Sequence, residues 1–221
     1  MNIDKYILNI FQQNSNHLRY IYISLDTSGA KKIFKNLLEI IVSLKYLCKC
    51  QLRLAIATSE LSKSTVNLQN PMKFLRLLGE RENCSTKQIA NLLDYLPNLE
   101  TFHLIVNQLK FSPQNKSNSS ITKCILNINQ FDATFINLIE FISTIAPHVE
   151  DLTIIFRTPF ELTTYVDIYQ WNQVIPLLLT KLQHLTLEIK HTDHITNEIW
   201  DRHCKRLSKF MTKNDIILRL V

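Results

Sequence analysis

Apolar residues recur along this chain in one short pattern, in which a first apolar position is followed by others three, five and seven residues later. The stretch LPNLETFHLIV carries the pattern most fully, with Leu99, Phe102, Leu104 and Val106 at these positions. The last three positions have a period of two, which is typical of a strand that buries one face. We expect the first position to lie in the turn that leads into the strand.

Six other segments match the first three positions of this pattern. Their apolar residues are Leu18, Ile21 and Ile23; Leu47, Cys50 and Leu52; Met72, Leu75 and Leu77; Ile121, Cys124 and Leu126; Val149, Leu152 and Ile154; and Leu182, Leu185 and Leu187. Successive first positions are 29, 25, 27, 22, 28 and 33 residues apart, a mean of 164/6 or about 27. This mean lies within the roughly 20–29 residues of a leucine-rich repeat. Ile216, Leu218 and Leu220 fit a partial eighth copy.

One such unit cannot bury its apolar side, whereas stacked units cover one another. The sequence therefore predicts an α/β leucine-rich-repeat solenoid, with a curved parallel sheet and with helices and loops on its convex side. We expect residues 1–221 to form a single domain of about seven repeats with a partial eighth. The alternative is an ordinary α/β sheet whose strands and helices happen to be evenly spaced.

The pattern also predicts where the elements lie. Strands are expected over 20–25, 51–57, 73–78, 101–106, 123–128, 151–156, 183–189 and 216–221. Helices are expected over 2–13, 30–43, 85–96, 132–145, 168–180 and 196–211. We expect Gly79 to close the third strand and Ser85 to start the helix that follows it.

Many leucine-rich repeats place an asparagine eight positions after the first leucine. Asn107 and Asn129 match this position, whereas the other copies have Asp26, Ala55, Glu80, Arg157 and Lys190 there. The sequence therefore predicts no continuous asparagine ladder, and it favours long, helix-backed repeats of the ribonuclease-inhibitor type.

Composition narrows the functional classes. With two glycines in the chain and neither GxGxxG nor GxxxxGK[ST], a glycine-rich phosphate loop is not expected. No apolar run approaches the roughly 18 residues of a membrane span, and residues 1–15 lack the apolar core of a signal peptide. Cys50 and Cys124 occupy core positions of the pattern, as expected of reduced, buried thiols. We expect an intracellular protein, cytoplasmic or nuclear.

The net charge is +6 and the isoelectric point is about 9.0, which permits an acidic partner or nucleic acid. The basic residues are dispersed, and the groups Lys31, Lys32, Lys35 and Lys205, Arg206, Lys209 are each expected to form a solvated helix face. A nucleic-acid-associated basic repeat protein is the alternative function.

Candidate catalytic and metal-binding groups are few. His191, His194, His203 and Cys204 cluster near the C-terminus, but they are expected to be solvated rather than to bind zinc. Cys84 has no oriented histidine nearby in the sequence. Glu80, Glu82 and Asp94 flank a helix start and are expected to be surface charges or caps. We therefore expect no enzyme activity, no metal and no cofactor.

Residues between the core positions are expected to line the concave face, which repeat proteins use for binding. They are Tyr20, Tyr22, Ser24, Gln51, Arg53, Phe74, Arg76, His103, Ile105, Ile125, Asn127, Thr153, Ile155, Thr186 and Glu188. Because aromatic residues and arginine dominate protein interfaces, the predicted partner-binding residues are Tyr20, Tyr22, Arg53, Phe74, Arg76 and His103. The alternative is that this face is partly used or covered by a neighbouring segment.

Four segments of the chain resemble F-box-associated leucine-rich-repeat proteins. They are LPNLETFHLIV, TIAPHVEDLTIIF, DIYQWNQVIPLLLTKLQHLTLEI and NPMKFLRLLGERENCSTKQIANLLDYLPNLETFHL. The resemblance covers about residues 15–190. In that family an F-box helix bundle docks on a cullin-type ubiquitin ligase and the repeats hold the substrate. No F-box opening of the type LPxE-(V/I/L)-L-x-x-I-(F/L) occurs here, so the resemblance implies the substrate-receptor half. It implies a protein substrate on the concave face, and ligase components reached through an F-box not seen in this chain.

Overall fold

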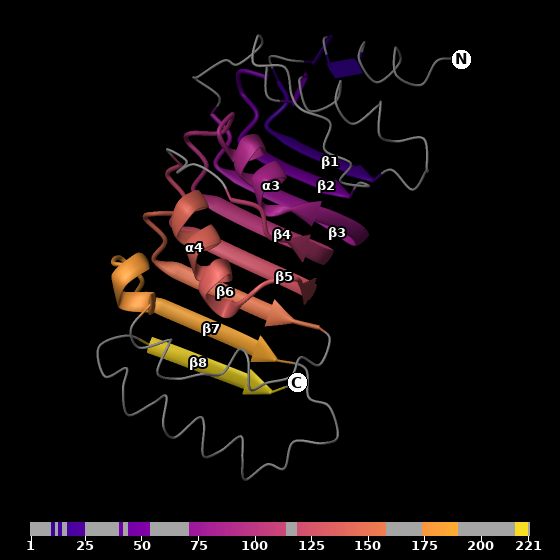
Figure 1. Ribbon diagram of the computed structural model, residues 1–221. Coiled ribbons are helices and arrows are strands. Elements are labelled where there is room, and N and C mark those ends of the chain that lie inside the picture. The colour runs from indigo at the N-terminus through magenta and orange to yellow at the C-terminus, as the bar shows by residue number, and fades with distance from the viewer. Residues whose placement is uncertain are drawn as a thin grey trace.

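Eight described strands lie side by side in one open sheet, in the order in which they occur in the chain (Figure 1). The computed structural model describes residues 10–11, 13–14, 17–24, 40–41, 44–53, 71–113, 119–157, 174–189 and 215–220. All seven neighbouring strand pairs are parallel. The structure is therefore an α/β fold with an all-parallel sheet, and the predicted parallel pairing is confirmed.

The strands are β1 Tyr20–Ser24, β2 Lys49–Arg53, β3 Phe74–Ser85, β4 Thr101–Lys110, β5 Lys123–Phe131, β6 Asp151–Phe156, β7 His184–Ile189 and β8 Asp215–Leu220. Each predicted strand is present, and β6 has the predicted bounds. β2 begins two residues earlier than predicted, whereas β3, β4 and β5 extend beyond their predicted ends. The predicted end of β3 at Gly79 is wrong, because the strand continues to Ser85.

Two helices, α3 Thr86–Leu93 and α4 Phe135–Ile145, lie over one face of the sheet (Figure 1). Each begins at a capping box, Ser85 with Gln88 and Thr134 with Asn137, in which side chains satisfy backbone N–H groups that the first turn leaves free. Residues 174–178 are also helical. The helices predicted over 2–13, 30–43 and 196–211 lie largely or wholly outside the described residues.

The register of the sheet aligns the copies of the apolar pattern. The second positions form one row, and the third positions form another two residues further along each strand. The first row is Ile21, Cys50, Leu75, Phe102, Cys124, Leu152, Leu185 and Ile216, and the second is Ile23, Leu52, Leu77, Leu104, Leu126, Ile154, Leu187 and Leu218. Over β1–β7 these side chains are buried, except for the half-buried Ile23. The predicted alignment of the strands is therefore confirmed.

The turn into each strand repeats as closely as the strand itself. The carbonyl group just before one strand accepts hydrogen bonds from two consecutive backbone N–H groups at the start of the next strand in the sheet. The donor–acceptor distances are 2.8–3.1 Å. The accepting carbonyls belong to Arg19, Cys48, Lys73, Glu100, Thr122 and Glu150, and the last donors are Gln183 and His184. The apolar first positions from Leu47 to Leu182 are buried beside these turns. Side chains and backbone thus keep the same register along the chain.

A local irregularity explains the length of β3. Pairing with β4 shifts between the pairs Gly79–Val106 and Asn83–Gln108, so that three residues of β3 face one of β4. Beyond this bulge, Asn107 Nδ2 donates to Asn83 Oδ1 at 3.3 Å, and Asn129 Nδ2 donates to Asn107 Oδ1 at 3.1 Å. Because of the bulge, Asn83 rather than the expected Glu80 stands beside Asn107, and a short amide ladder joins β3, β4 and β5.

Candidate functional site

The side of the sheet opposite α3 and α4, here called the far face, carries the residues between the core positions. Alternate residues of a strand project to opposite sides, and the register places these residues in three rows. The rows over β1–β7 are Tyr20, Lys49, Phe74, Thr101, Lys123, Asp151 and His184; Tyr22, Gln51, Arg76, His103, Ile125, Thr153 and Thr186; and Ser24, Arg53, Leu78, Ile105, Asn127, Ile155 and Glu188.

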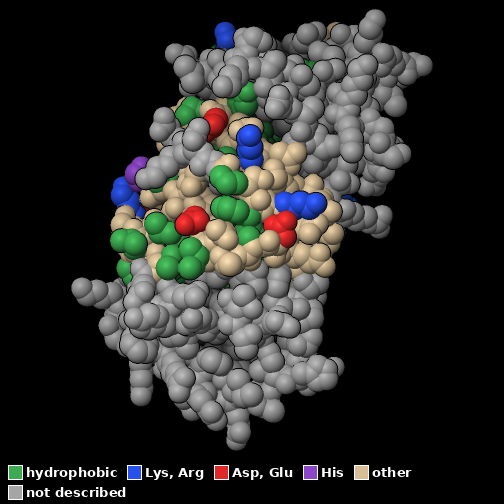
Figure 2. Space-filling model, viewed as in Figure 1, with side chains coloured by type: hydrophobic (Ala, Val, Ile, Leu, Met, Phe, Trp, Pro, Cys, Tyr) green, Lys and Arg blue, Asp and Glu red, His purple; other side chains and the backbone are tan. Residues whose placement is uncertain are grey.

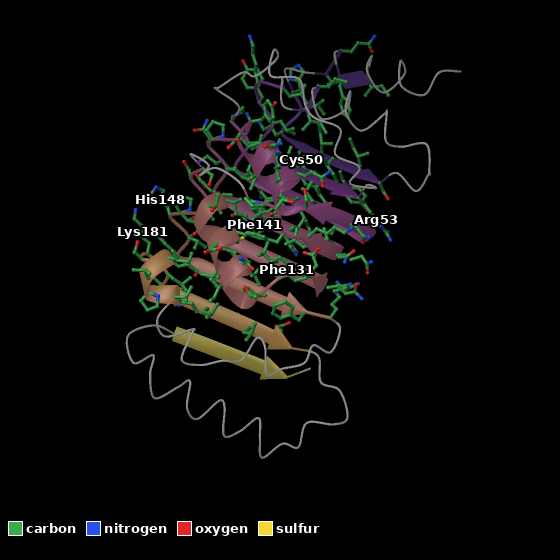
Figure 3. All side chains as sticks on the ribbon, in the orientation of Figure 1. Cys50, Arg53, Phe131, Phe141, His148 and Lys181 are labelled. Carbon is green, nitrogen blue, oxygen red and sulfur yellow. The ribbon has the colours of Figure 1, made fainter. Side chains whose placement is uncertain are left out.

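The six predicted binding residues lie on four adjacent strands of the far face. Tyr20 and Tyr22 on β1 are 55% and 52% exposed. Arg53 is exposed at the carboxyl end of β2, at the opposite edge of the sheet from His148 and Lys181 (Figure 3). Phe74 precedes Arg76 on β3, and Arg76 is the direct cross-strand partner of His103 on β4. The sheet thus brings all six to the same side, and their role in binding stays a prediction.

The far face is electrostatically uneven. Within these three rows, the positions on β1–β5 include the cations Lys49, Arg53, Arg76 and Lys123 and no aspartate or glutamate, whereas Glu80 and Glu82 of β3 have side chains outside the described residues. Acidic positions occur on β6 and β7, at Asp151 and Glu188, and Asp151 lies 3.9 Å from His184. The part of these three rows on β1–β5 therefore carries net positive charge. By contrast, side chains of both charges and hydrophobic groups are mixed on the helix-covered face (Figure 2).

His103 is uncharged at neutral pH. Burial lowers its pKa to about 4, and the positive charges of Arg76 and Arg157 add to this effect. Arg157 follows β6, two strands away from β4 in the sheet. Sequence reasoning did not select Arg157, because nothing in the chain indicates that its charge acts on His103.

Two polar atoms at the centre of the far face have no hydrogen-bond partner among the described residues. They are Nε of Arg76 and Oδ1 of Asn127, and both atoms are buried. Asn127 is 7% exposed and pairs in register with Ile105 and Ile155 on its two sides. Buried polar groups are normally paired, so these two unpaired atoms are exceptions to that rule.

Buried thiols are not candidate nucleophiles. Burial raises the pKa of Cys50, Cys84 and Cys124 to about 12 each, and the thiolate, not the thiol, is the reactive form. Cys84, considered as a nucleophile from the sequence, is therefore kept protonated.

In the folded protein we expect a thiol reagent such as iodoacetamide to modify Cys48 well before Cys50, Cys84 or Cys124, because Cys48 alone of these four is not buried. Mass spectrometry of peptides, before and after unfolding in urea, measures each rate. Labelling of Cys84 as fast as Cys48 in the folded state would contradict this packing.

Other sequence candidates do not form a site in the described part of the chain. His191, His194, His203 and Cys204 lie outside the described residues, as do the side chains of Glu80 and Glu82. Asp94 is an exposed residue at the C-cap of α3. The described residues contain no group of three or more His, Cys, Asp or Glu placed to hold a metal ion.

The pKa of His103 predicts a loss of stability in acid. Below about pH 6.5 the unfolded chain takes up a proton on His103, whereas the folded chain does so near pH 4. Stability is therefore lost as the pH falls from about 6.5 to 4. Because His103 is only partly buried, we expect its share to be about 1 kcal/mol. The urea midpoint should fall less between pH 7 and pH 5 in His103→Gln than in the unmodified protein. An equal fall in both proteins would refute this prediction.

Comparisons with family models, curated proteins and solved structures find no match to this chain. Within the described residues, no helix is both long and apolar enough to cross a membrane.

Proposed function

We propose that this chain is a leucine-rich-repeat solenoid that binds protein partners on the far face of its sheet and has no enzymatic activity of its own. The regular in-order stacking of the strands supports the solenoid, because core rows and backbone turns both repeat from strand to strand. Repeat proteins of this construction use extended sheet faces for binding.

One observation carries the binding proposal. Tyr20, Tyr22, Arg53, Phe74, Arg76 and His103, scattered over more than eighty residues of sequence, share one side of four adjacent strands. Tyrosine, phenylalanine and arginine are enriched at protein interfaces and arginine and tyrosine among their energetic hot spots. Tyr20 and Tyr22 are exposed on β1, the edge strand of the sheet, and are best explained as contact residues for a partner.

The proposed biological role is substrate recognition for an F-box-type ubiquitin-ligase receptor. Its support is the resemblance of the repeat segments to F-box-associated leucine-rich-repeat proteins. If an F-box is fused to the N-terminus, the fusion should lower the cellular level of a partner that binds the far face. An unchanged level of such a partner would argue against the receptor role while leaving the binding role intact.

Charge reversal tests the binding surface. The double variant Arg53→Glu, Arg76→Glu changes two far-face cations, and the matched control Lys87→Glu, Lys181→Glu changes two exposed cations elsewhere. Quantitative mass spectrometry of proteins purified with each variant should show partners lost from the far-face variant and kept by the control. An identical partner list for both variants would overturn the assignment of the binding surface.

A further inference from the structure

We propose that the far face recognises an acidic segment of its protein partner, with Arg76 and His103 binding a carboxylate. This inference rests on the proposed function and names the chemistry of the partner. It is carried by two features of the far face: its charge and the unpaired guanidinium of Arg76.

The charge of β1–β5 favours a partner of opposite sign. In the described part of the three far-face rows, its four cations have no acidic neighbour on these five strands. The nearby pair Lys73 and Glu100, at 2.6 Å, balances its own charges. A positive surface raises the rate of encounter with acidic segments and selects against basic ones.

Arg76 is a cation without a carboxylate partner in the described part of the chain. Its guanidinium forms no hydrogen bond or ion pair with any described residue, and its Nε is buried without a partner. The planar donors of arginine match the two oxygens of a carboxylate. A glutamate or aspartate of the partner would supply the missing negative charge.

His103 stands beside Arg76 on the neighbouring strand. Its neutral ring carries one N–H donor and one acceptor nitrogen, and it makes no side-chain hydrogen bond to a described residue. A carboxylate held by Arg76 can therefore accept a second hydrogen bond from His103. We assign His103 as a positioning residue for the carboxylate.

The same arrangement argues against nucleic acid as the occupant. Asp151 and Glu188 lie on β6 and β7 of this face, where they would repel a phosphate backbone that runs across the sheet. Isoleucines and an amide acceptor also offer little to phosphate groups, which prefer cations and N–H donors.

The test uses peptides displayed from a random library and selected on the full chain. The enriched sequences should be rich in Asp and Glu. An enriched peptide, labelled with fluorescein, is then measured by anisotropy beside a copy in which Asp and Glu become Asn and Gln. We expect the neutral copy to bind roughly tenfold more weakly or worse, because charge-assisted hydrogen bonds are lost.

Protein variants locate the contact. Arg76→Gln should weaken the acidic peptide roughly tenfold and abolish its advantage over the neutral copy, whereas Lys87→Gln on α3 should leave binding unchanged. Circular dichroism of each variant checks folding. The comparison of the acidic peptide with its neutral copy tests the inference even if Arg76→Gln does not fold. If the enriched peptides are neutral or basic and bind Arg76→Gln as well as the unmodified protein, the inference of an acidic partner segment is wrong. The proposed protein-binding function is unaffected by that result. Failure to enrich any peptide, with Arg76-dependent binding of oligo-uridine RNA, overturns both the inference and the proposed function.

Discussion

Replacing Leu104 by Ala is expected to lower the free energy of unfolding by about 2–5 kcal/mol. Leu104 is fully buried at the centre of β4, between Leu77 and Leu126 in the second core row. The strands on both sides are fixed by backbone hydrogen bonds, so they cannot close over the cavity that the substitution leaves. The cost therefore includes both the lost burial and the cavity.

Leu177 provides a matched control for this substitution, because the same side chain is 75% exposed there. Leu177→Ala should change the free energy of unfolding by less than about 0.5 kcal/mol. Urea denaturation followed by circular dichroism gives both values. If the two variants are equally stable, Leu104 does not occupy the packed core described here. Leu152→Ala, in the first core row of β6, should repeat the large loss.

Replacing Thr86 by Val is expected to cost about 1–3 kcal/mol, although the two side chains have nearly the same shape. Thr86 is buried at the start of α3, where its Oγ1 donates to the carbonyl oxygen of Ser112 and accepts from the N–H of Ser112, both at 2.9 Å. Valine would leave both backbone groups of Ser112 without these partners. This side chain thus ties the helix after β3 to the segment after β4.

The control for this prediction is Thr153→Val on the far face of β6. The Thr153 side chain makes no hydrogen bond with a described residue and is half-buried, so its substitution should be nearly neutral. Denaturation midpoints of the two variants measure the difference. Equal stability of Thr86→Val and Thr153→Val would mean that the Thr86 bridge contributes nothing.

The sequence predicts the centre of each strand well, because burial constrains those positions. A residue in a core row must be apolar, and the alternation of such residues fixes which side of the strand meets the helices. The positions of Phe102 and Leu104 therefore predict both the register of β4 and the side on which His103 lies. The side follows from β4 alone, whereas the register also needs the matching positions of the neighbouring copies.

The ends of β3, β4 and β5 follow a different rule. Past Gly79, β3 reads mostly polar, and it remains a strand because its backbone pairs with β4 beyond a bulge. Backbone pairing of this kind does not require apolar side chains, so it leaves no apolar pattern in the sequence. The role of Asn83 is for this reason found only in the structure, since the bulge brings its side chain within hydrogen-bonding distance of Asn107.

The candidate site divides in the same way. Which residues lie on the far face can be read from alternation along each strand, and Arg76 and His103 were found by it. That Arg76 Nε and Asn127 Oδ1 lack partners depends on which groups other strands supply around them. The effect of Arg157 on the pKa of His103 likewise joins β4 to the end of β6, a proximity that no local pattern contains.

The most direct test of this account is a set of spin-label distances along one far-face row. Cysteines introduced at Tyr20, Lys123 and His184 lie on β1, β5 and β7, and serine at Cys48 and Cys204 leaves them as the labelling sites. For parallel strands stacked in chain order, backbone separations should approach about 19 Å from Tyr20 to Lys123 and about 29 Å from Tyr20 to His184. A Tyr20–His184 distance no longer than the Tyr20–Lys123 distance would contradict the ordered sheet and the binding face built on it.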